Sequence, residues 1–379
     1  NSVAGSLTLS GNITYGSVGL TIGGSGNTTI SGNIGTGGGA LTKDGTGILV
    51  LSGTNSYTGS TTVSNGTLVV SNNSALGATT NAITVSSGAT LQLSDVTIGA
   101  NPLSLTGSGY TGAGGSLVSV GNNIYQGSIT LGSNTTINTY SGLFNITGSS
   151  KTISGTNTNL TFIGSGILVI DDAISIGTGS LTQNGAGITY LQNSNTYSGG
   201  SYLSLGTLAP SAIGALGSGK ITFQGGSIRA YSSTNSDQTA LYGKFNLLTT
   251  SGTYSIDPGN YTVNFTTSGF TGSGASFAVV ANSGISGTTG SWTAASSSSG
   301  KVVFDTASVN TYGGSTTVSG ATLQLGNSNA TIPAGSTLVV SGGTFDINGR
   351  TPSYGSVTVS SGSIIDSAVS KGTIAATSF

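Results

Sequence analysis

Short stretches in which apolar and polar residues alternate recur along most of this chain. Typical examples are Leu-Thr-Leu at residues 7–9, Ile-Thr-Val at 83–85 and Val-Thr-Val at 357–359. Alternation with a period of two places one row of side chains inward and the next outward, as in a half-buried β-strand. Glycine, serine and asparagine separate the stretches and favour turns. No stretch shows helical periodicity of useful length, so the pattern predicts an all-β chain of many short strands.

A longer motif occurs three times. The segment NSYTGSTTVSNGTLVV at residues 55–70 recurs as NTYSGGSYLSLGTLAP from Asn195 and as NTYGGSTTVSGATLQL from Asn310. A shift of 140 residues aligns residues 41–77 with residues 181–217 without a gap, and 17 of the 37 positions are identical. A catalytic site is rarely needed three times in one chain, whereas a repeating architecture needs its building rule in every unit. The repeat therefore indicates a structural element rather than a catalytic site.

Many short strands can form a sandwich, a barrel or a solenoid. Self-similarity over long distances in a single chain favours the solenoid, in which each rung of the coil stacks on the previous one. The heptapeptide SGATLQL, at residues 87–93 and again at 319–325, adds to this self-similarity. We therefore expect a parallel β-helix, and the chirality of β-crossover connections favours the right-handed form.

Three regions are predicted along the chain. Residues 1–235 hold the first two repeat units, and residues 301–379 hold the third unit and a C-terminal strand. Residues 236–300 differ, because 8 of the 25 aromatic residues fall within 241–300. This stretch is either an inserted antiparallel β-subdomain or a group of widened rungs.

The C-terminal segment GTIAATSF, residues 372–379, alternates again. It forms either the last rung or a free strand that pairs with a neighbouring subunit. The second alternative arises because a solenoid end exposes unpaired main-chain groups unless it is capped. The residues expected in such an assembly strand are Thr373, Ile374 and Phe379.

Composition narrows the class of protein. Only 4% of the residues are charged, the net charge is -1, and 66 of the 379 residues are glycine. A disordered linker is a possible interpretation of such a chain. However, 35% of the residues are hydrophobic, the mean hydropathy is +0.19, and no net charge keeps the chain expanded. The absence of a basic patch argues against a nucleic-acid partner, and no apolar run is long enough for a transmembrane helix.

The sequence opens NSVAGSLTLS, without methionine and without a charged, apolar leader. We expect either a mature secreted chain that has lost its signal peptide or an excised fragment.

Residues 41–77 closely resemble the autotransporter-associated β-strand repeat. The matching positions are the Leu41-Thr42 start, the Gly45-x-Gly47 turn, Asn55-x-Tyr57, Gly59 and Gly66-Thr67-Leu68. Residues 181–217 match more loosely, and residues 302–325 match only the second half. The resemblance implies an exported bacterial protein with a β-helical stalk, and a role in adhesion, surface assembly or secretion.

The repeated asparagine, tyrosine and glycine are interpreted as corners of the rungs. The asparagine side chain would replace a main-chain turn and stack on its equivalents. A row of tyrosines that stacks on carbohydrate is the alternative, but 140 and 115 residues separate the three copies. The predicted corner residues are Asn55, Tyr57, Gly59, Asn195, Tyr197, Gly199, Asn310, Tyr312 and Gly314.

Candidate catalytic chemistry is sparse. Asp171-Asp172 is the one acidic doublet, and paired carboxylates serve glycoside hydrolysis or calcium binding. Adjacent strand residues point to opposite faces, however, so we expect a solvated turn pair. The chain has no histidine and no cysteine, which excludes Ser-His-Asp and Cys-His arrangements. A Ser-Lys dyad stays formally open without a supporting motif. No cofactor or metal site is predicted.

The leading functional hypothesis is a secreted, non-enzymatic subunit of an extracellular filament or surface layer, joined to copies of itself by end-to-end strand pairing. The alternative is an adhesin passenger whose residues 236–300 carry a receptor or glycan site. A polysaccharide lyase or hydrolase is a third hypothesis. It is disfavoured because histidine and glutamate, from which an acid/base pair is usually built, are absent.

Overall fold

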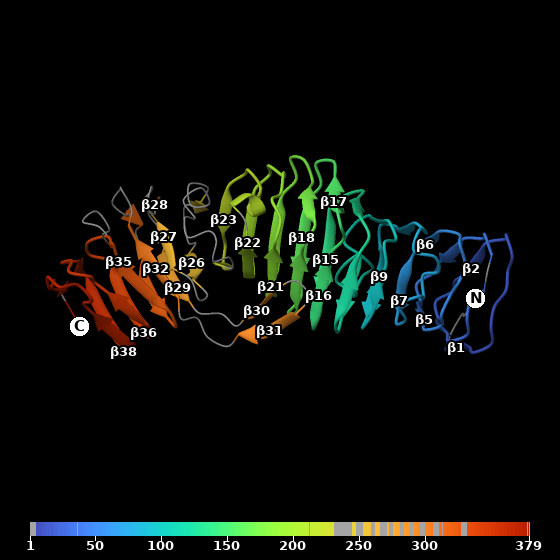
Figure 1. Ribbon diagram of the computed structural model, residues 1–379, viewed down its shortest axis with the longest axis horizontal. Coiled ribbons are helices and arrows are strands. Elements are labelled where there is room, and N and C mark those ends of the chain that lie inside the picture. The colour runs from blue at the N-terminus through green and yellow to red at the C-terminus, as the bar shows by residue number, and fades with distance from the viewer. Residues whose placement is uncertain are drawn as a thin grey trace. The chain divides into compact units, whose positions relative to one another are not determined.

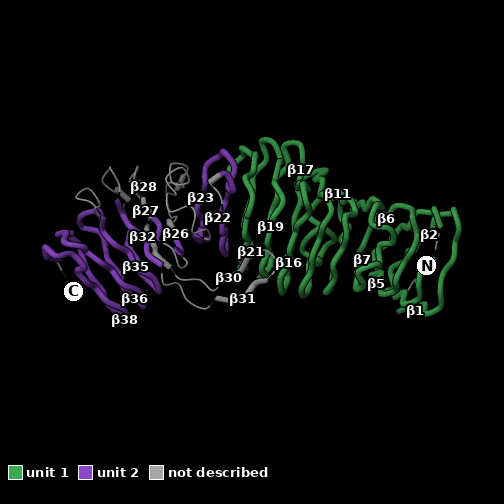
Figure 2. The backbone as a smooth tube through the Cα atoms, in the orientation of Figure 1, with its two compact units in different colours: residues 1–200 green, residues 201–379 purple. Residues whose placement is uncertain are grey.

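The computed structural model of this chain consists almost entirely of short β-strands (Figure 1). It describes residues 5–35, 37–211, 213–230, 300–305, 311–312, 314–326, 332–376 and 378, together with Pro258 and the strands between residues 245 and 295. The chain divides into two compact units, Asn1–Gly200 and Ser201–Phe379 (Figure 2). Parallel strands coil as a right-handed β-solenoid, which confirms the predicted fold class.

The strands of unit 1 stack in three columns, in each of which neighbouring strands are parallel and hydrogen-bonded. The first column contains β2 (Leu20–Ile22), β4 (Leu41–Lys43), β6 (Thr61–Val63), β8 (Ile83–Val85), β11 (Leu103–Leu105), β14 (Ile129–Leu131), β17 (Thr152–Gly155) and β20 (Ala173–Ser175). The second contains β1 (Ser6–Leu9), β3 (Asn27–Ile30), β5 (Ile48–Leu51), β7 (Gly66–Val70), β9 (Ala89–Ser94), β12 (Leu117–Val120), β15 (Thr135–Thr139), β18 (Leu160–Ile163) and the start of β21 (Leu181–Leu191). The third contains β10 (Thr97–Ile98), β13 (Asn123–Tyr125), β16 (Leu143–Ile146), β19 (Ile167–Ile170) and the end of β21.

The core of unit 1 consists of inward side chains that stack from rung to rung. In the first column, the residues in register are Leu41, Thr61, Ile83, Leu103, Ile129, Ile153 and Ile174, each at most 1% exposed. Each buried aliphatic side chain in such a stack contributes about 1.5–3 kcal/mol. Thr61 is the one polar member of the stack and needs a hydrogen-bond partner inside the core.

A glycine connects two successive strand segments of the repeat. Gly66 has a φ of 67°, and Gly206, at the same position of the second repeat, also has a φ of 67°. A Cβ atom at Gly66 would also press on the carbonyl oxygens of Gly45 and Gly47. The backbone therefore favours glycine at this position in the first two copies, whereas the third copy has Ala321 there.

Unit 2 is built from the same kind of short parallel strands. Its strands before residue 300 are β22 (Ser201–Pro210), β23 (Ile221–Phe223), β24 (Ser227–Arg229), β25 (Phe245–Leu247), β26 (Thr253–Asp257), β27 (Thr262–Phe265), β28 (Thr271–Gly272), β29 (Ser276–Val280), β30 (Gly284–Thr288) and β31 (Ser291–Ala295). Its later strands are β32 (Lys301–Phe304), β33 (Thr311–Tyr312), β34 (Thr316–Ser319), β35 (Thr322–Leu325), β36 (Thr337–Asp346), β37 (Ser353–Tyr354), β38 (Ser356–Ile365) and β39 (Ala375–Ala376). A short 3-10 helix, η1 (Ile213–Leu216), is the one helix among the described residues, and its four residues are too few to span a membrane.

The described strands of the aromatic-rich stretch pair in two ways. Strands β25, β26, β27 and β29 pair in parallel with neighbouring rungs, whereas β30 and β31 form an antiparallel hairpin. Much of residues 236–300 lies outside the described residues. The domain boundaries at 235 and 300 therefore stay a prediction.

Candidate functional site

Asn55 lies at the corner that follows β5, where it connects three consecutive rungs. Its Oδ1 atom accepts the main-chain N–H of Ile34 at 2.8 Å on the preceding rung. Its Nδ2 atom donates to the carbonyl oxygen of Ala75 at 2.5 Å on the following rung. The side chain is 5% exposed, so these bonds are formed away from bulk water. Asn55 thus supplies, from its side chain, the main-chain pairing that the corner interrupts.

Tyr57 provides the partner that Thr61 needs within the apolar stack. The phenol oxygen of Tyr57 lies 2.7 Å from Oγ1 of Thr61, and both residues are fully buried. Burial raises the pKa of Tyr57 far above its ordinary value, although the hydrogen bond with Thr61 opposes this. The main-chain carbonyl of Tyr57 also accepts Nδ2–H of Asn81 at 2.9 Å.

Gly59 completes the corner because the preceding rung passes close to it. A Cβ atom at this position would collide with the carbonyl group of Gly39 on that rung. The glycine is needed for this close approach of two backbones.

The second copy of the motif has the same geometry. Oδ1 of Asn195 accepts the N–H of Ile174 at 2.7 Å, and Tyr197 is fully buried. A Cβ atom at Gly199 would collide with the carbonyl oxygens of the preceding rung. In the third copy, Asn310 lies outside the described residues. Of Tyr312 only the main chain is described, in β33, and Gly314 is half-buried.

The tyrosines of the first two copies offer no surface to a ligand. Both Tyr57 and Tyr197 are 0% exposed, so no sugar ring reaches either phenol ring in this structure. The two tyrosines pack inside their own rungs, so we assign them a structural role.

Corner asparagines that the repeat motif does not include form equivalent bonds. Nδ2 of Asn101 donates to the carbonyls of Ala78 and Asn81, at 2.9 and 3.0 Å. Oδ1 of Asn123 accepts the N–H of Val96 at 2.9 Å. These residues were not predicted from the sequence, although their spacing of roughly one rung was a usable signal. A related set of exposed asparagines accepts a main-chain N–H one rung later through Oδ1: Asn12, Asn27, Asn33, Asn122, Asn134, Asn157 and Asn159.

Lys43 was likewise not predicted as a core residue. It is 2% exposed and lies in register between Ile22 and Val63 on the inward side of the first column. Its ammonium group donates to the carbonyl oxygens of Asp44 at 3.0 Å, Gly45 at 2.7 Å and Asn65 at 3.0 Å. Burial lowers the pKa of Lys43, and Asp44 partly restores it.

Gln183 occupies the same position of the second repeat. Its neutral amide group also donates to the carbonyl oxygens of the adjacent turn. Its Nε2 atom donates to the carbonyls of Gly185 and Gly187 at 3.0 and 3.3 Å. Its Oε1 atom accepts the hydroxyl of Thr189 at 2.8 Å. In both repeats, a long side chain with N–H donors ties the Gly-x-Gly turn to the core.

The acidic doublet differs from the solvated pair that the sequence led us to expect. Asp172 is 3% exposed, and its Oδ1 atom accepts the N–H of Gly148 at 3.0 Å. Burial raises the pKa of Asp172 to about 6, against the opposing effect of the Gly148 bond. Asp171 is half-buried, and burial raises its pKa although hydrogen bonds from Thr147 and Asn145 lower it. The expectation was wrong for Asp172 because its carboxylate turns back toward the preceding rung.

Residues 373–378 pair with earlier strands of unit 2. Thr373 and Ile374 immediately precede β39, which pairs in parallel with β37 of the same chain. The carbonyl of Ser378 accepts the N–H of Val357 at 3.0 Å. Phe379 lies outside the described residues. A role of this segment in assembly stays a prediction.

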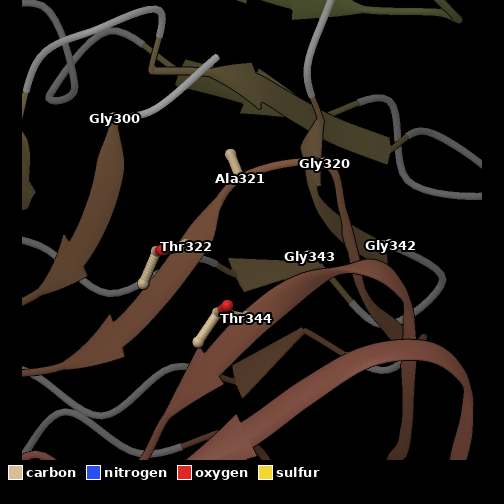
Figure 3. A pocket seen from close by; sticks show the side chains of 7 residues that line it. All are labelled: Gly300, Gly320, Ala321, Thr322, Gly342, Gly343 and Thr344. Carbon is tan, nitrogen blue, oxygen red and sulfur yellow. The ribbon is translucent and has the colours of Figure 1, made fainter. Parts of the chain in front are cut away.

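Unit 2 also contains a small open hollow of about 160 Å³ along three rungs. Figure 3 shows the hydroxyl groups of Thr322 and Thr344 on neighbouring strands, with glycines at the bends beside them. The lining residues are Gly300, Gly320, Ala321, Thr322, Gly342, Gly343 and Thr344. They include no ionisable group and no aromatic ring, so the hollow offers neither acid/base chemistry nor a stacking platform. Among the described residues, no group of three or more His, Cys, Asp or Glu is placed to hold a metal ion.

Comparison with protein families identifies the repeat. The family model of the passenger-associated-transport-repeat matches residues 41–70, 181–209 and 297–325. This confirms the resemblance that the sequence indicated and adds residues 297–301 to the third unit. Comparisons with curated proteins and with solved structures gave no match. Fold and repeat together define the class: a parallel β-solenoid that carries three passenger-type repeats.

Proposed function

We propose that this chain is an exported structural protein, the β-solenoid stalk of a bacterial surface passenger, and that it has no enzymatic activity. The main observation behind this proposal is that polar residues of the repeat are buried and form their hydrogen bonds within the coil. Asn55, Tyr57 and Lys43 are buried and bond to the main chain or to core hydroxyls of their own rungs. The most characteristic side chains of the repeat therefore stabilise the coil and contact nothing outside it.

The composition suits such a stalk outside a cell. Eight lysines and arginines in 379 residues leave trypsin-like proteases few sites. The absence of histidine, cysteine and methionine removes most groups that titrate near neutral pH or oxidise readily. Stability then depends on main-chain ladders and apolar stacks, which respond little to salt.

Surface labelling of intact producing cells tests the location. An antibody against the purified chain is expected to bind unpermeabilised cells or the culture medium, and brief proteinase K treatment of intact cells should remove the cell-bound signal. Antigen that is detected only after permeabilisation would contradict an exported stalk.

Self-assembly into a filament or surface layer is a second candidate, and a specific observation favours it. Leu7 in β1 and Val359 in β38 occupy inward positions of their strands but are 40% and 49% exposed. These side chains are apolar surface that another chain could cover. Concentrated protein should show rods or sheets in negative-stain images. A monodisperse preparation at high concentration would count against this candidate.

An adhesive role is the remaining candidate. The antiparallel hairpin β30–β31 departs from the parallel coil and is the described feature that favours it. A chain that lacks residues 284–295 should keep its thermal unfolding transition but lose attachment to host cells or glycans. Unchanged attachment would remove the hairpin as a binding element.

A further inference from the structure

We propose that Lys301 and Gln324 become joined by an isopeptide bond between Nζ of the lysine and Cδ of the glutamine, with Asp346 as the acid/base group of the reaction. The product is a covalent cross-link between two adjacent strands of unit 2, β32 and β35. The proposal concerns side chains of one chain and does not depend on the location or the partners proposed above.

The three side chains lie on three successive strands. β32 pairs with β35 in the register Val303↔Gln324, and β35 pairs with β36 in the register Gln324↔Asp346. Lys301 lies two residues before Val303 in β32, so the two side chains point to the same face of the sheet. Strand pairing therefore holds an amine, an amide and a carboxylate in one row.

The lysine amine lies next to the carbonyl group of the glutamine amide. Nζ of Lys301 is 3.0 Å from Oε1 of Gln324. A C=O bond is about 1.2 Å long, so Nζ is at most about 4.2 Å from Cδ, the carbon atom that an amine attacks. Reacting atoms need to approach to about 3–3.5 Å, and the flexible stem of lysine covers the difference. Because β32 and β35 are paired, the reaction is spared the entropic cost of bringing the two groups together.

The carboxylate of Asp346 contacts the other end of the same amide. Nε2 of Gln324 donates to Oδ2 of Asp346 at 2.7 Å, and Asp346 is 3% exposed. The hydroxyl of Ser367 donates to Oδ2 at 2.6 Å, and its main-chain N–H donates to Oδ1 at 3.0 Å. Burial raises the pKa of Asp346, but hydrogen bonds from Ser367, Gln324 and Asn348 hold it below its ordinary value. An ionised carboxylate is thus fixed beside the leaving nitrogen.

The reaction replaces one amide by another. Lys301 releases one proton to solvent, and the neutral Nζ attacks Cδ of Gln324 to give a tetrahedral intermediate. In that intermediate Nζ and Nε2 are bonded to the same carbon atom, so Asp346 takes a proton from Nζ and delivers it to Nε2. The Cδ–Nε2 bond then breaks, and Nε2 leaves as ammonia. No oxidant, reductant or water is consumed, and the escape of ammonia into solvent makes the bond permanent.

The chain contains a counterpart of this glutamine in different surroundings. The heptapeptide SGATLQL occurs twice, and Gln92 holds in the first copy the position of Gln324 in the second. At Gln92 the position of the amine is taken by Thr67, and the position of the carboxylate is taken by Val118. The heptapeptide therefore pairs with its neighbours without an amine or a carboxylate beside it. Both groups are features of the Gln324 site, and Gln92 is its internal control.

Intact-mass spectrometry of the full chain tests the bond. The wild type should weigh less than its sequence by one ammonia molecule, and peptide sequencing should find a branched peptide that joins Lys301 to Gln324. The matched variant is Lys301→Arg, which keeps a positive charge and N–H donors but has no neutral amine at physiological pH. Its mass should equal that of its sequence, and the peptide that contains Gln92 should be unmodified in both proteins.

Two outcomes of this measurement would overturn the proposal. A wild type that keeps its full sequence mass after prolonged incubation at neutral pH would leave the three side chains as a hydrogen-bonded row. A loss of ammonia that persists in Lys301→Arg would arise elsewhere in the chain, for example by ring closure at an asparagine.

A second variant tests the part of Asp346. Asp346→Asn keeps the size of the side chain and an oxygen atom that accepts a hydrogen bond, but it cannot relay a proton. The cross-linked fraction of freshly made protein, followed with time, should grow at least about 100-fold more slowly than in the wild type. Thermal unfolding checks that the variant is folded. Cross-linking at the wild-type rate would exclude Asp346 as the acid/base group.

Discussion

Oδ1 of Asn55 accepts the main-chain N–H of Ile34, 21 residues earlier, at a distance of 2.8 Å. The same relationship links Asn195 to Ile174 in the second repeat, again over 21 residues, at 2.7 Å. In both repeats this side chain thus bonds to the preceding rung at the same spacing of 21 residues. This explains why the motif keeps asparagine where a longer or an apolar side chain would leave the corner unpaired.

Replacement of Asn55 by alanine is expected to lower the free energy of unfolding by about 1–3 kcal/mol, because a buried N–H and a buried carbonyl lose their partner. Urea unfolding measures the change, and hydrogen exchange at the Ile34 amide locates it. The control is Asn33→Ala, whose exposed Oδ1 accepts the N–H of Thr54 at 3.0 Å. If Asn33→Ala lowered the free energy of unfolding as much as Asn55→Ala, burial would not explain the effect at Asn55.

Gly59→Ala is expected to destabilise the protein by about 1–3 kcal/mol or more, because its Cβ atom would meet the Gly39 carbonyl, which is main chain and cannot rotate away. Gly38→Ala is the matched control on a neighbouring rung, since a Cβ atom there meets nothing within 4 Å. Thermal unfolding of the two variants gives the comparison. Equal transition temperatures would show that the corner relaxes more easily than the structure implies.

Lys43→Met is expected to cost more stability than Lys43→Gln. Methionine fills the space but leaves three carbonyl oxygens without a donor, at about 1–3 kcal/mol for each buried group that stays unpaired. Glutamine restores donors, as Gln183 does in the second repeat. Its Oε1 atom would lack the hydroxyl donor that Thr189 gives to Gln183, because the equivalent residue of the first repeat is Leu49. Chemical denaturation should therefore rank wild type above Lys43→Gln and Lys43→Gln above Lys43→Met. The reverse order of the two variants would show that burial of the charge is the greater cost.

Asp172 is expected to make the protein less stable as the pH rises. Its pKa is about 6 in the folded chain, against an ordinary value of 3.8, so the folded state binds the proton more tightly than the unfolded state. Stability attributable to this group is therefore highest below pH 4, declines between about pH 4 and 6, and stays low above that.

Asp172→Asn should remove this decline and raise the transition temperature at pH 7.5 relative to wild type. The measurement is thermal unfolding at pH 4.5 and 7.5 for wild type, Asp172→Asn and the exposed control Asp44→Asn. A wild type and an Asp172→Asn variant that respond identically to pH would exclude Asp172 as the titrating group.

The sequence indicated that Asn55 and Asn195 lie between strands, because residues that favour turns are a local signal. It did not indicate their hydrogen-bond partners, which lie 21 residues earlier. Lys43 was not predicted to be buried, although alternation from Leu41 places it on the inward face. A charged side chain is rarely buried without partners, and the partners of Lys43 include Asn65, which lies on the next rung. Asp172 was misjudged for the same reason, since its partner Gly148 lies 24 residues away.

The sequence by itself determined that the chain is an all-β coil of short strands, because alternation, turn residues and repeated spacing are properties of each rung alone. Only the tertiary structure decided which column each segment joins. Leu41 lies in the eight-stranded column with Leu20 and Thr61, whereas Leu181, at the same position of the second repeat, pairs with Leu160 in another column. Pairing in a solenoid requires only that each rung match its immediate neighbour. Rungs of unequal length between the repeats therefore shift the second repeat to a different side of the coil.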